Sequence, residues 1–324
     1  MIERSPEPPG VYADLDTLIG MKPEARRLGA ASRWLAGGDI RAVSSARLRG
    51  RGLDMGELRA VAGGADIRTI DWKATARTGS PMRRDYTPET DRPALLVVDQ
   101  RLGMFFGSRT SMKSVVAAEM AAVLAWQVIG GGDRVGALVF NDRDTRMIRP
   151  AGGDRQAVPV LDAVVRFNRA LRADDAGSSP GMLDHALRCA DRLVTHDWLV
   201  CVISDLDGAG ADTASLLASI ARRNDVVVCT VDDPLERELP ASGHLVVTDG
   251  ELQLEIDGGE ALLSEQLSKQ VARRGVIARR TAAGRSLPVV SLTTTVPVVE
   301  QLHALAPRAR RPSTAGARGH HAGV

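Results

Sequence analysis

The sequence is poor in aromatic residues and has almost no excess charge of either sign. Phe, Trp and Tyr together make up 3% of the 324 residues, too few for the stacking surfaces that bind single-stranded nucleic acids. Lysine and arginine number 42 against 40 aspartates and glutamates, so the chain as a whole has no strong attraction for a phosphate backbone. Both shortages argue against nucleic acid as a partner.

Cysteine is also scarce. The three cysteines are Cys189, Cys201 and Cys229. Their number is odd and no C-x-x-C or Cys/His cluster occurs, which argues against a disulfide framework and against a zinc site. Cys201 and Cys229 lie inside apolar runs, so we expect them to be buried small hydrophobic residues in a reducing compartment.

The sequence lacks the long apolar segments that signal peptides and membrane spans require. The first ten residues, MIERSPEPPG, lack the apolar core of a signal peptide. No apolar run approaches the roughly 20 residues that cross a bilayer. We therefore expect a cytoplasmic protein without a membrane span.

From residue 93 onward, short apolar runs alternate with segments of helical length. The runs have the length and apolar content of strands buried on both faces; they are ALLVVDQ, DRVGALVFND, DWLVCVISDLDG and DVVVCTVDD. The alternation predicts an α/β fold with a doubly wound, mostly parallel sheet. Farther along, HLVVTDG followed by ELQLEIDG predicts a β-hairpin.

The composition divides the chain into three segments. Residues 1–92 are expected to form an N-terminal module, helical at first and then β-rich or irregular where arginine and glycine are frequent. Residues 93–306 are expected to form the α/β domain with a C-terminal extension that includes a helix over 260–282. Residues 307–324 form a basic tail that we expect to be disordered.

Two aspartates occupy positions at which parallel sheets place their binding sites. Asp99 closes the first strand of the domain, and Asp205 closes the strand VCVIS. The carboxyl ends of parallel strands meet at one edge of the sheet, beside the switch in strand order. We therefore expect the two carboxylates to be neighbours in a site.

The order of these elements resembles a von Willebrand factor type A domain. The preceding segment is similar to the signature of the bacterial domain-of-unknown-function family 58, in which Gly-Arg-Gly, Glu-x-Arg and Gly-Asp-Asp-x-Arg-x-Ile-Asp-Trp-x-x-x-Ala-Arg come before a type A domain. The matching residues are Gly50, Arg51, Gly52, Glu57, Arg59, Asp66, Arg68, Ile70, Asp71, Trp72, Ala76 and Arg77. Ala65 departs from the pattern, which has an acid at that position.

This resemblance implies a partner and a role. Relatives are commonly encoded beside MoxR-type AAA+ ATPases and are thought to work with them in assembling or activating other proteins. The resemblance therefore implies a non-catalytic adaptor that binds a MoxR-type AAA+ ATPase and further protein clients.

The resemblance also marks the first loop as a candidate metal site. Metal-binding type A domains use three loops that supply Asp-x-Ser-x-Ser, a Thr and an Asp, all oxygen ligands suited to Mg²⁺ or Mn²⁺. This chain keeps Asp99 and Asp205, but Arg101 and Gly103 replace the two serines and Gly181 stands where the Thr belongs. Two neighbouring carboxylates repel each other, so a cation is expected between them.

Three interpretations of this degenerate site remain open. In the first, the Arg101 guanidinium replaces the metal and bridges the carboxylates. In the second, Mg²⁺ or Mn²⁺ still binds Asp99 and Asp205, with Ser178 or Ser179 reaching in from a shifted loop. In the third, Arg101 points to solvent and the aspartates cap nearby backbone.

Two further segments carry candidate contacts. Phe105 and Phe106 either tuck under the helix that follows or present an apolar surface to a partner. The segment DIRTIDWKATAR is either an edge strand or turn in which Trp72 is buried, or a docking surface for an ATPase. The candidate partner-binding residues are Asp99, Arg101, Gly103, Phe105, Phe106, Gly181, Asp205 and Asp207.

Two other classes of function compete with an adaptor. A metal-assisted hydrolase would use Asp99, Asp205 and Asp207, but no nucleophile or general base accompanies these acids. No Walker A sequence occurs, so we do not expect ATP hydrolysis by this chain. The other class is a plain scaffold whose site is inactive.

Overall fold

The computed structural model describes most of the α/β domain and parts of the remaining chain. The described residues are 9–29, 53–54, 58–60, 72–80, 82–84, 87–88, 92–172, 177, 179–237, 244–248, 253–257, 274, 276–277 and 287–305. The strands of the main sheet are β5 (Pro93–Asp99), β6 (Arg134–Phe140), β7 (Thr145–Ala151), β8 (Leu199–Ser204), β9 (Asp225–Asp232) and β12 (Val289–Thr293). The helices around it are α1 (Leu15–Gly20), α2 (Lys22–Gly29), α5 (Lys113–Gly130), α6 (Ala157–Arg169), α7 (Gly181–Leu193), α8 (Ala211–Ala221), α9 (Pro234–Arg237) and α11 (Val298–Leu305), with 3-10 turns η3 (Leu102–Met104) and η4 (Asp154–Gln156).

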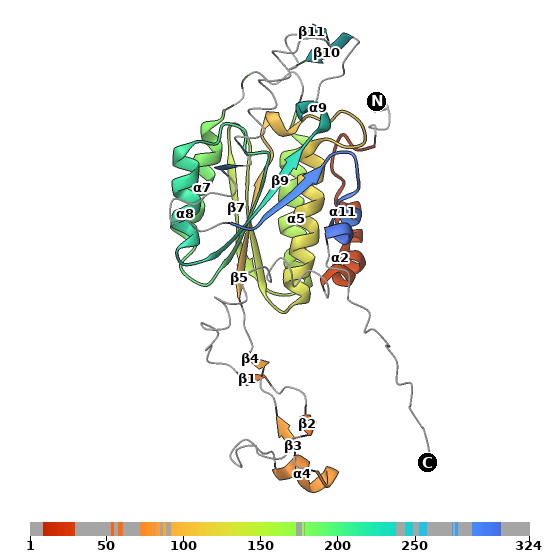
Figure 1. The fold of residues 1–324 in the computed structure, drawn as a ribbon, viewed down its shortest axis with the longest axis vertical. Helices are drawn as coiled ribbons and strands as arrows, with labels where there is room; N and C mark the ends of the chain where they lie inside the picture. The colour runs from red at the N-terminus through yellow and green to blue at the C-terminus, as the bar shows by residue number, and fades with distance from the viewer. Residues whose placement is uncertain are drawn as a thin grey trace, which may run out of the picture.

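The six-stranded sheet has the order β12-β9-β8-β5-β6-β7 (Figure 1). All neighbouring strands are parallel except β6 and β7, which form an antiparallel hairpin at one edge. The strand β5 lies between β8 and β6. The chain leaves β5 through α5 and returns to the sheet as β6 on one side of β5, and β8 pairs with the other side of β5. This confirms the predicted doubly wound, mostly parallel α/β fold and places the switch point at the carboxyl end of β5.

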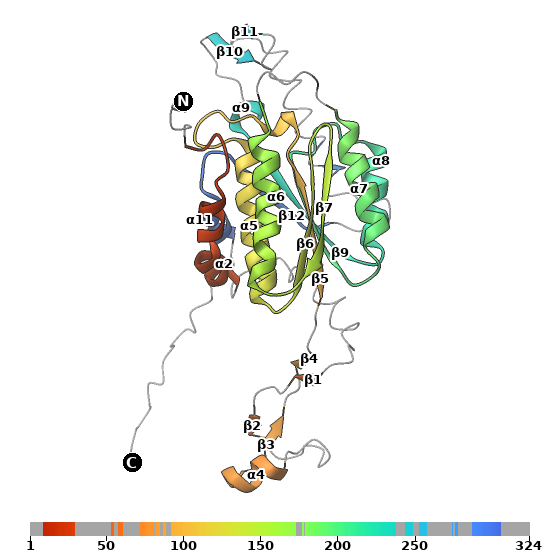
Figure 2. The same ribbon diagram turned by 180° about the vertical axis from the view of Figure 1, so that it is seen from behind.

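Helices cover both faces of the sheet (Figures 1 and 2). The helices α5 and α6 lie on one face, and α7 and α8 lie on the other. Along β5, Leu96 and Val98 belong to the core cluster on the α5 side, whereas Leu95 and Val97 belong to the cluster on the α7 side. Successive side chains of a strand point to opposite faces, so a strand covered on both faces must be apolar throughout.

The helix α5 is the core helix of its layer. Within the described part of the chain it is the one helix long and apolar enough to cross a membrane, and 83% of that stretch is buried inside the domain. The expectation that no apolar segment is long enough to cross a membrane therefore does not hold for α5 by length and composition. Its all-round apolar surface is accounted for by the sheet on one side and by α2, α6 and α11 on the others.

Residues 9–29 pack into the same core, although they were expected to belong to the N-terminal module. Leu18 and Leu28 are buried in the cluster that contains α5. The indole Nε1 of Trp126 donates a hydrogen bond to the Leu18 carbonyl at 3.0 Å. A boundary at residue 92 therefore does not separate α1 and α2 from the α/β domain, because their apolar faces are buried against α5.

Short elements are described in the segment that carries the signature residues. They are β1 (Leu53–Asp54), β2 (Leu58–Ala60), α4 (Trp72–Thr78), β3 (Met82–Arg84) and β4 (Thr87–Pro88), with β1 antiparallel to β4 and β2 to β3. Trp72 begins α4 and is 62% exposed, so the expectation of a buried Trp in an edge strand or turn is wrong. The alternating charges favoured a strand, but Lys, Ala and Arg are good helix formers.

Several sequence-based expectations lie outside the described residues. These are the signature residues Arg51, Glu57, Asp66, Arg68 and Asp71, most of the helix expected over 260–282, and the tail 307–324. The predicted hairpin is confirmed by β10 (His244–Thr248) and β11 (Gln253–Asp257), which pair in antiparallel register.

Candidate functional site

The candidate site lies at the carboxyl ends of β5 and β8. These strands are parallel neighbours, and Val98 pairs with Ile203, so the residues that follow each of them lie side by side. Asp99 is fully buried and Asp205 is 1% exposed. The structure thus brings together the two aspartates that the sequence pattern predicts as neighbours.

Asp99 is held by the side chain of Arg101, two residues farther along the chain. The Arg101 Nε lies 3.0 and 3.1 Å from the two carboxylate oxygens of Asp99, and Nη2 lies 2.7 Å from Oδ2. The Arg101 backbone N–H also donates to Oδ1 at 3.0 Å, and the Ser204 hydroxyl donates to Oδ2 at 2.6 Å. Both oxygens of this carboxylate are therefore engaged by N–H and O–H donors.

Arg101 joins the three loops of the site. The first loop follows β5, the second precedes α7 and the third follows β8. Its Nη1 donates to the carbonyls of Pro180, at 3.4 Å, and Asp207, at 3.2 Å. Its Nη2 lies 3.7 Å from Asp205 Oδ1. Burial works to lower the pKa of Arg101, but the Asp99 carboxylate, followed by Asp205, raises it above its ordinary value. A charged guanidinium therefore lies between the two aspartates, as the first of the three interpretations predicts.

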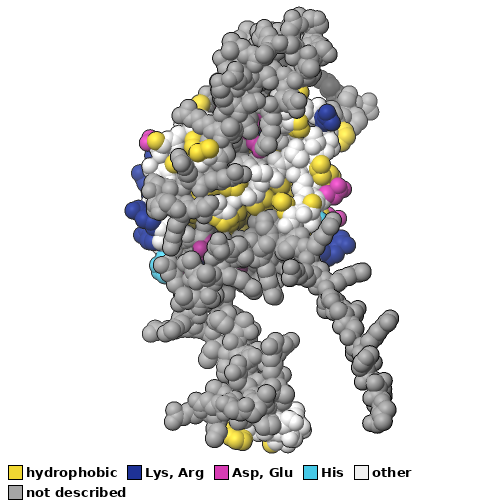
Figure 3. All heavy atoms as spheres, in the orientation of Figure 1, with side chains coloured by type: hydrophobic (Ala, Val, Ile, Leu, Met, Phe, Trp, Pro, Cys, Tyr) yellow, Lys and Arg dark blue, Asp and Glu magenta, His cyan; other side chains and the backbone are white. Residues whose placement is uncertain are grey.

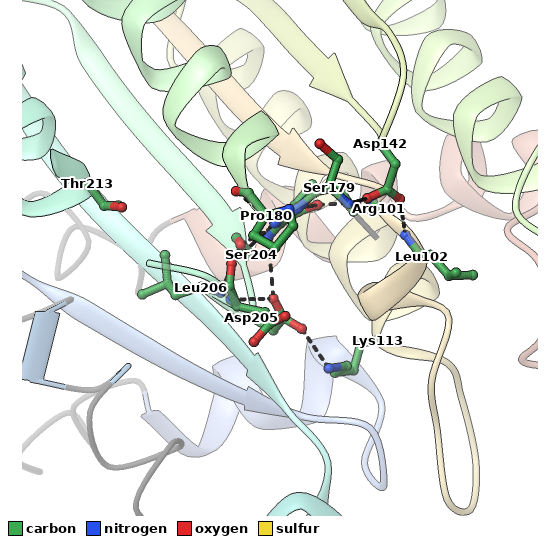
Figure 4. A network of polar contacts seen from close by, with 12 residues as sticks. Arg101, Leu102, Lys113, Asp142, Ser179, Pro180, Ser204, Asp205, Leu206 and Thr213 are labelled. Carbon is green, nitrogen blue, oxygen red and sulfur yellow. Dashed lines mark hydrogen bonds and ion pairs between the residues drawn. The ribbon is translucent and has the colours of Figure 1, made fainter. Parts of the chain in front are cut away.

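A second buried cation, Lys113, lies on the other side of Asp205. Its Nζ lies 2.7 Å from Asp205 Oδ2 and 2.5 Å from Glu236 Oε1, and the side chain is 2% exposed. Figure 4 shows the Lys113–Asp205 contact below the group formed by Arg101, Pro180 and Ser204. Burial opposes the charge, yet Asp205 and Glu236 raise the pKa of Lys113.

Sequence reasoning did not identify Lys113 as a site residue. It is the first residue of a mostly apolar helix, where the helix dipole disfavours a cation. A lysine in that position needs an anion nearby, and this was the available signal. Burial works to raise the pKa of Asp205, but Lys113, Arg274 and Arg101 hold it at about 2.

The alternation of charge continues outward through Arg274. This residue forms an ion pair with Asp207 through Nη2, and its Nη1 lies 3.7 Å from Glu236 Oε2. We call the whole set the ion-pair chain; its members are Asp99, Arg101, Asp205, Lys113, Glu236, Arg274 and Asp207. Glu236 and Arg274 had no sequence signal, because they are remote from the aspartates along the chain.

The Asp142 side chain and the close approach of Gly208 to Pro180 hold the three loops together. Asp142, which follows β6, accepts hydrogen bonds from the backbone N–H groups of Leu102 and Ser179, each at 2.6 Å (Figure 4). Gly208 has φ +74°, and a Cβ at that position would lie 2.4 Å from the Pro180 Cβ. The first loop and the third loop are thus both tied to the loop that precedes α7.

The two glycines expected to line the site have different surroundings. A Cβ on Gly103 would lie 3.8 Å from Asp205 Oδ2, so this position faces the ion-pair chain. Gly181 begins α7, and no atom lies within 4 Å of the position its Cβ would occupy. Gly181 is exposed, so it belongs to the surface of this end of the sheet.

Phe105 and Phe106 are both half-buried. The Phe105 ring lies 5.4 Å from the ring of Tyr12, in the N-terminal segment. The Phe106 ring lies 5.8 Å from the Lys113 ammonium. Lys113 begins α5, so the Phe106 contact agrees with the interpretation in which the rings pack against the helix that follows. The contact of Phe105 with the N-terminal segment was included in neither interpretation.

The residues at this site do not fit the metal of a type A domain. Arg101 and Gly103 offer no side-chain oxygen, and the oxygens of Asp99 already accept hydrogen bonds from Arg101 and Ser204. Asp205 is paired with Lys113. Among the described residues, no group of three or more His, Cys, Asp or Glu side chains is arranged to hold an ion.

The fold and the site define an α/β domain with a mostly parallel six-stranded sheet and a buried charged site at the carboxyl ends of β5 and β8. The chain matches the family described as "Protein of unknown function DUF58" over residues 57–277, and it belongs to this family. This confirms the family that the sequence motifs indicate. Uncharacterized proteins of Mycobacterium tuberculosis and Mycobacterium bovis are each 31% identical over 247 residues, which are 76% of this chain and 76% of theirs.

Solved structures with a similar fold come from other proteins of low sequence identity. One is the conserved hypothetical protein BatB from Bacteroides thetaiotaomicron, at 13% identity over 66% of this chain and 95% of that chain, with a TM-score of 0.37. Another is the SpRpn10 VWA domain, at 10% identity over 67% of this chain and 95% of that chain, with a TM-score of 0.35.

Proposed function

We propose that this protein is a non-catalytic interaction protein that binds its partner through the loops at the carboxyl end of the sheet. Its own cations replace the metal of a metal-binding type A domain, which makes the site a degenerate form of that metal site. The observation that carries this proposal is the Arg101 guanidinium, which covers both oxygens of Asp99 and reaches toward Asp205. A fixed internal cation holds the loops without requiring an ion from solution.

The charge state of the acids supports a non-catalytic role. A general base works best when its pKa lies near the operating pH. The pKa of Asp205 is held at about 2 by neighbouring cations, so this carboxylate has little tendency to accept a proton. Asp99 and Asp207 each form an ion pair with an arginine, so neither is a free carboxylate. A metal-assisted hydrolase is therefore the weaker proposal.

We propose a MoxR-type AAA+ ATPase as the partner, in the cytoplasm, acting on further protein clients. The support is the resemblance carried by the signature motif, together with membership of the family. The surface for the contact would include Gly181 and the exposed part of Asp207.

Binding of the ATPase can be tested with a pair of matched glycine variants. Gly181 and Gly20 are both exposed, and neither has an atom within 4 Å of its Cβ position. Both variants, Gly181→Glu and Gly20→Glu, should therefore fold. We expect the wild-type chain and Gly20→Glu to bind a purified MoxR-type AAA+ ATPase in the presence of ATP, and Gly181→Glu to lose binding. Equal binding by both variants would exclude this face of the protein.

Replacement of the metal can be tested by equilibrium dialysis with Mg²⁺ and Mn²⁺. We expect no micromolar binding by the wild-type chain, because Arg101 and Lys113 already neutralise the carboxylates. Micromolar binding that Asp99→Ala abolishes would refute internal replacement and support a metal-dependent, ligand-binding type A domain. The Gly20→Glu variant adds an exposed carboxylate away from the site. Dialysis of this variant therefore measures how much an exposed acid alone adds to metal binding.

A further inference from the structure

The strand β7 forms an edge of the main sheet. It is the last strand in the order, and among the residues that the structure describes it pairs only with β6. Thr145, Arg146, Met147 and Arg149 are exposed, Met147 at 36%. An edge strand with free backbone groups can pair with an extended segment of another chain.

The turn before β7 determines which backbone groups are free. The Asn141 N–H donates to the Asp144 carbonyl at 3.0 Å, which closes the turn between β6 and β7. Hydrogen-bonded and non-hydrogen-bonded pairs alternate along an antiparallel ladder, so Arg146 faces Val139 in a bonded pair. The N–H and C=O groups of Thr145 and Met147 therefore point away from β6.

The pairing edge ends at a bulge. The register shifts between Val135 and Ala137, opposite β7. A Cβ on Gly136 would lie 2.6 Å from the Ile148 carbonyl and 2.7 Å from the Pro150 nitrogen, so only glycine allows this close approach. The Gln156 side chain donates to the Arg149 carbonyl at 2.9 Å. The free stretch therefore covers the first half of β7, next to the candidate site.

Charge of one sign gathers along this edge. Residues 143–151 contain three arginines and one aspartate, and Arg143, Arg146 and Arg149 are all exposed. Arg146 and Arg149 form no ion pair with any residue that the structure describes. The opposite edge differs, because β12 contains no charged residue. In the view of Figure 3, hydrophobic and uncharged side chains lie at the centre of the described surface, with Lys, Arg, Asp and Glu toward its margins.

We infer that the β7 edge binds an extended, acidic segment of a protein partner as a seventh strand. The backbone groups of Thr145 and Met147 supply the pairing, and Arg146 and Arg149 supply attraction for aspartate and glutamate side chains. This surface begins at the hairpin that carries Asp142, so it continues the loops of the candidate site along the side of the sheet. The inference goes beyond the proposed function and does not depend on it.

The same residues have a second reading, in which charged side chains keep the edge from pairing at all. The two readings differ in their response to an acidic peptide. The probe is a ten-residue peptide of alternating Glu and Thr, with two control peptides: one has Lys in place of Glu, and one is N-methylated at alternate residues so that it cannot form a ladder. Fluorescence anisotropy measures binding, and hydrogen exchange measures protection of the Thr145 and Met147 amides.

We expect the acidic peptide to bind and to protect both amides, and neither control peptide to do so. Arg146→Glu with Arg149→Glu should weaken binding at least tenfold. The matched charge reversal at Arg222 and Arg223, two exposed residues after α8, should not. Met147→Pro removes the outward N–H from an edge position that tolerates proline, and it should abolish binding.

Four results would overturn the inference. They are no binding of the acidic peptide, equal binding of the N-methylated peptide, equal weakening by the reversal at Arg222 and Arg223, and protection of the Thr145 and Met147 amides that rises with protein concentration without peptide. The last result would assign the edge to a second copy of this chain. The N-methylated peptide tests the ladder on the wild-type protein, so the inference remains testable if Met147→Pro does not fold.

Discussion

Replacing Lys113 by methionine should destabilise the protein strongly, because it leaves acids buried without a counterion. Methionine has nearly the length of lysine and fills the same space against Phe106. The change removes the ammonium that lies 2.7 Å from Asp205 and 2.5 Å from Glu236. Removing one partner of a buried ion pair costs about 3–5 kcal/mol. We expect a loss of that size in the free energy of unfolding at pH 7.

The loss should depend on pH in a direction set by Asp205. In the wild-type protein its pKa is lowered to about 2, below the unfolded value of about 3.9. Its contribution to stability is therefore present above the unfolded pKa and is lost as the pH falls toward 2. Without Lys113, burial moves the pKa of Asp205 upward, so the variant loses stability as the pH rises above about 4. The difference between variant and wild type should shrink on acidification.

Urea denaturation at pH 7 and at pH 4.5 measures both effects, with Lys22→Met as the control. Lys22 lies 2.6 Å from Asp154, but these side chains are 28% and 53% exposed, and exposed pairs contribute only about 0–1 kcal/mol. The reasoning is refuted if Lys113→Met costs no more than Lys22→Met, or if its cost at pH 4.5 equals its cost at pH 7.

Two further predictions concern the third loop and the thiols. Gly208→Ala should destabilise by more than about 1 kcal/mol, since its φ is positive and its Cβ would meet Pro180; Gly153→Ala has a similar φ but open space, so equal losses in urea denaturation would contradict a packing effect. Burial raises the pKa of Cys201 to about 12 and also raises that of Cys229. At pH 8 a thiol reagent should therefore modify only the half-exposed Cys189 in the folded protein, and all three cysteines in urea. Rapid labelling of all three thiols in the folded protein would count against a closed core.

Some site residues could be predicted because a local rule determines their place. An apolar run that ends in an aspartate predicts a buried strand with a carboxylate at its carboxyl end, and this rule located Asp99 and Asp205 correctly. Arg101 lies two residues beyond Asp99, so its reach to that carboxylate is also a local matter. Which interpretation of Arg101 applied was open, since the direction of a side chain depends on what surrounds it.

Other contacts could not be read from the sequence, because they join distant segments. Lys113 meets Glu236 across 123 residues, and Arg274 meets Asp207 across 67. The N-terminal helices looked like part of a separate module, since their apolar residues do not reveal which surface they cover. Trp72 was misjudged for a related reason: alternation of charge indicates a period, but burial depends on a neighbouring surface.

The sequence by itself determined the α/β fold, the family and the pair of aspartates at the carboxyl end of the sheet. These depend on hydrophobic periodicity, contiguous motifs and the geometry of parallel strands, all of which are local along the chain. Only the tertiary structure decided that Lys113 lies against Asp205 and that Arg101 also reaches toward Asp205. A buried charge is stable only beside its counterion, and the folded chain supplies that counterion from segments that the sequence keeps apart.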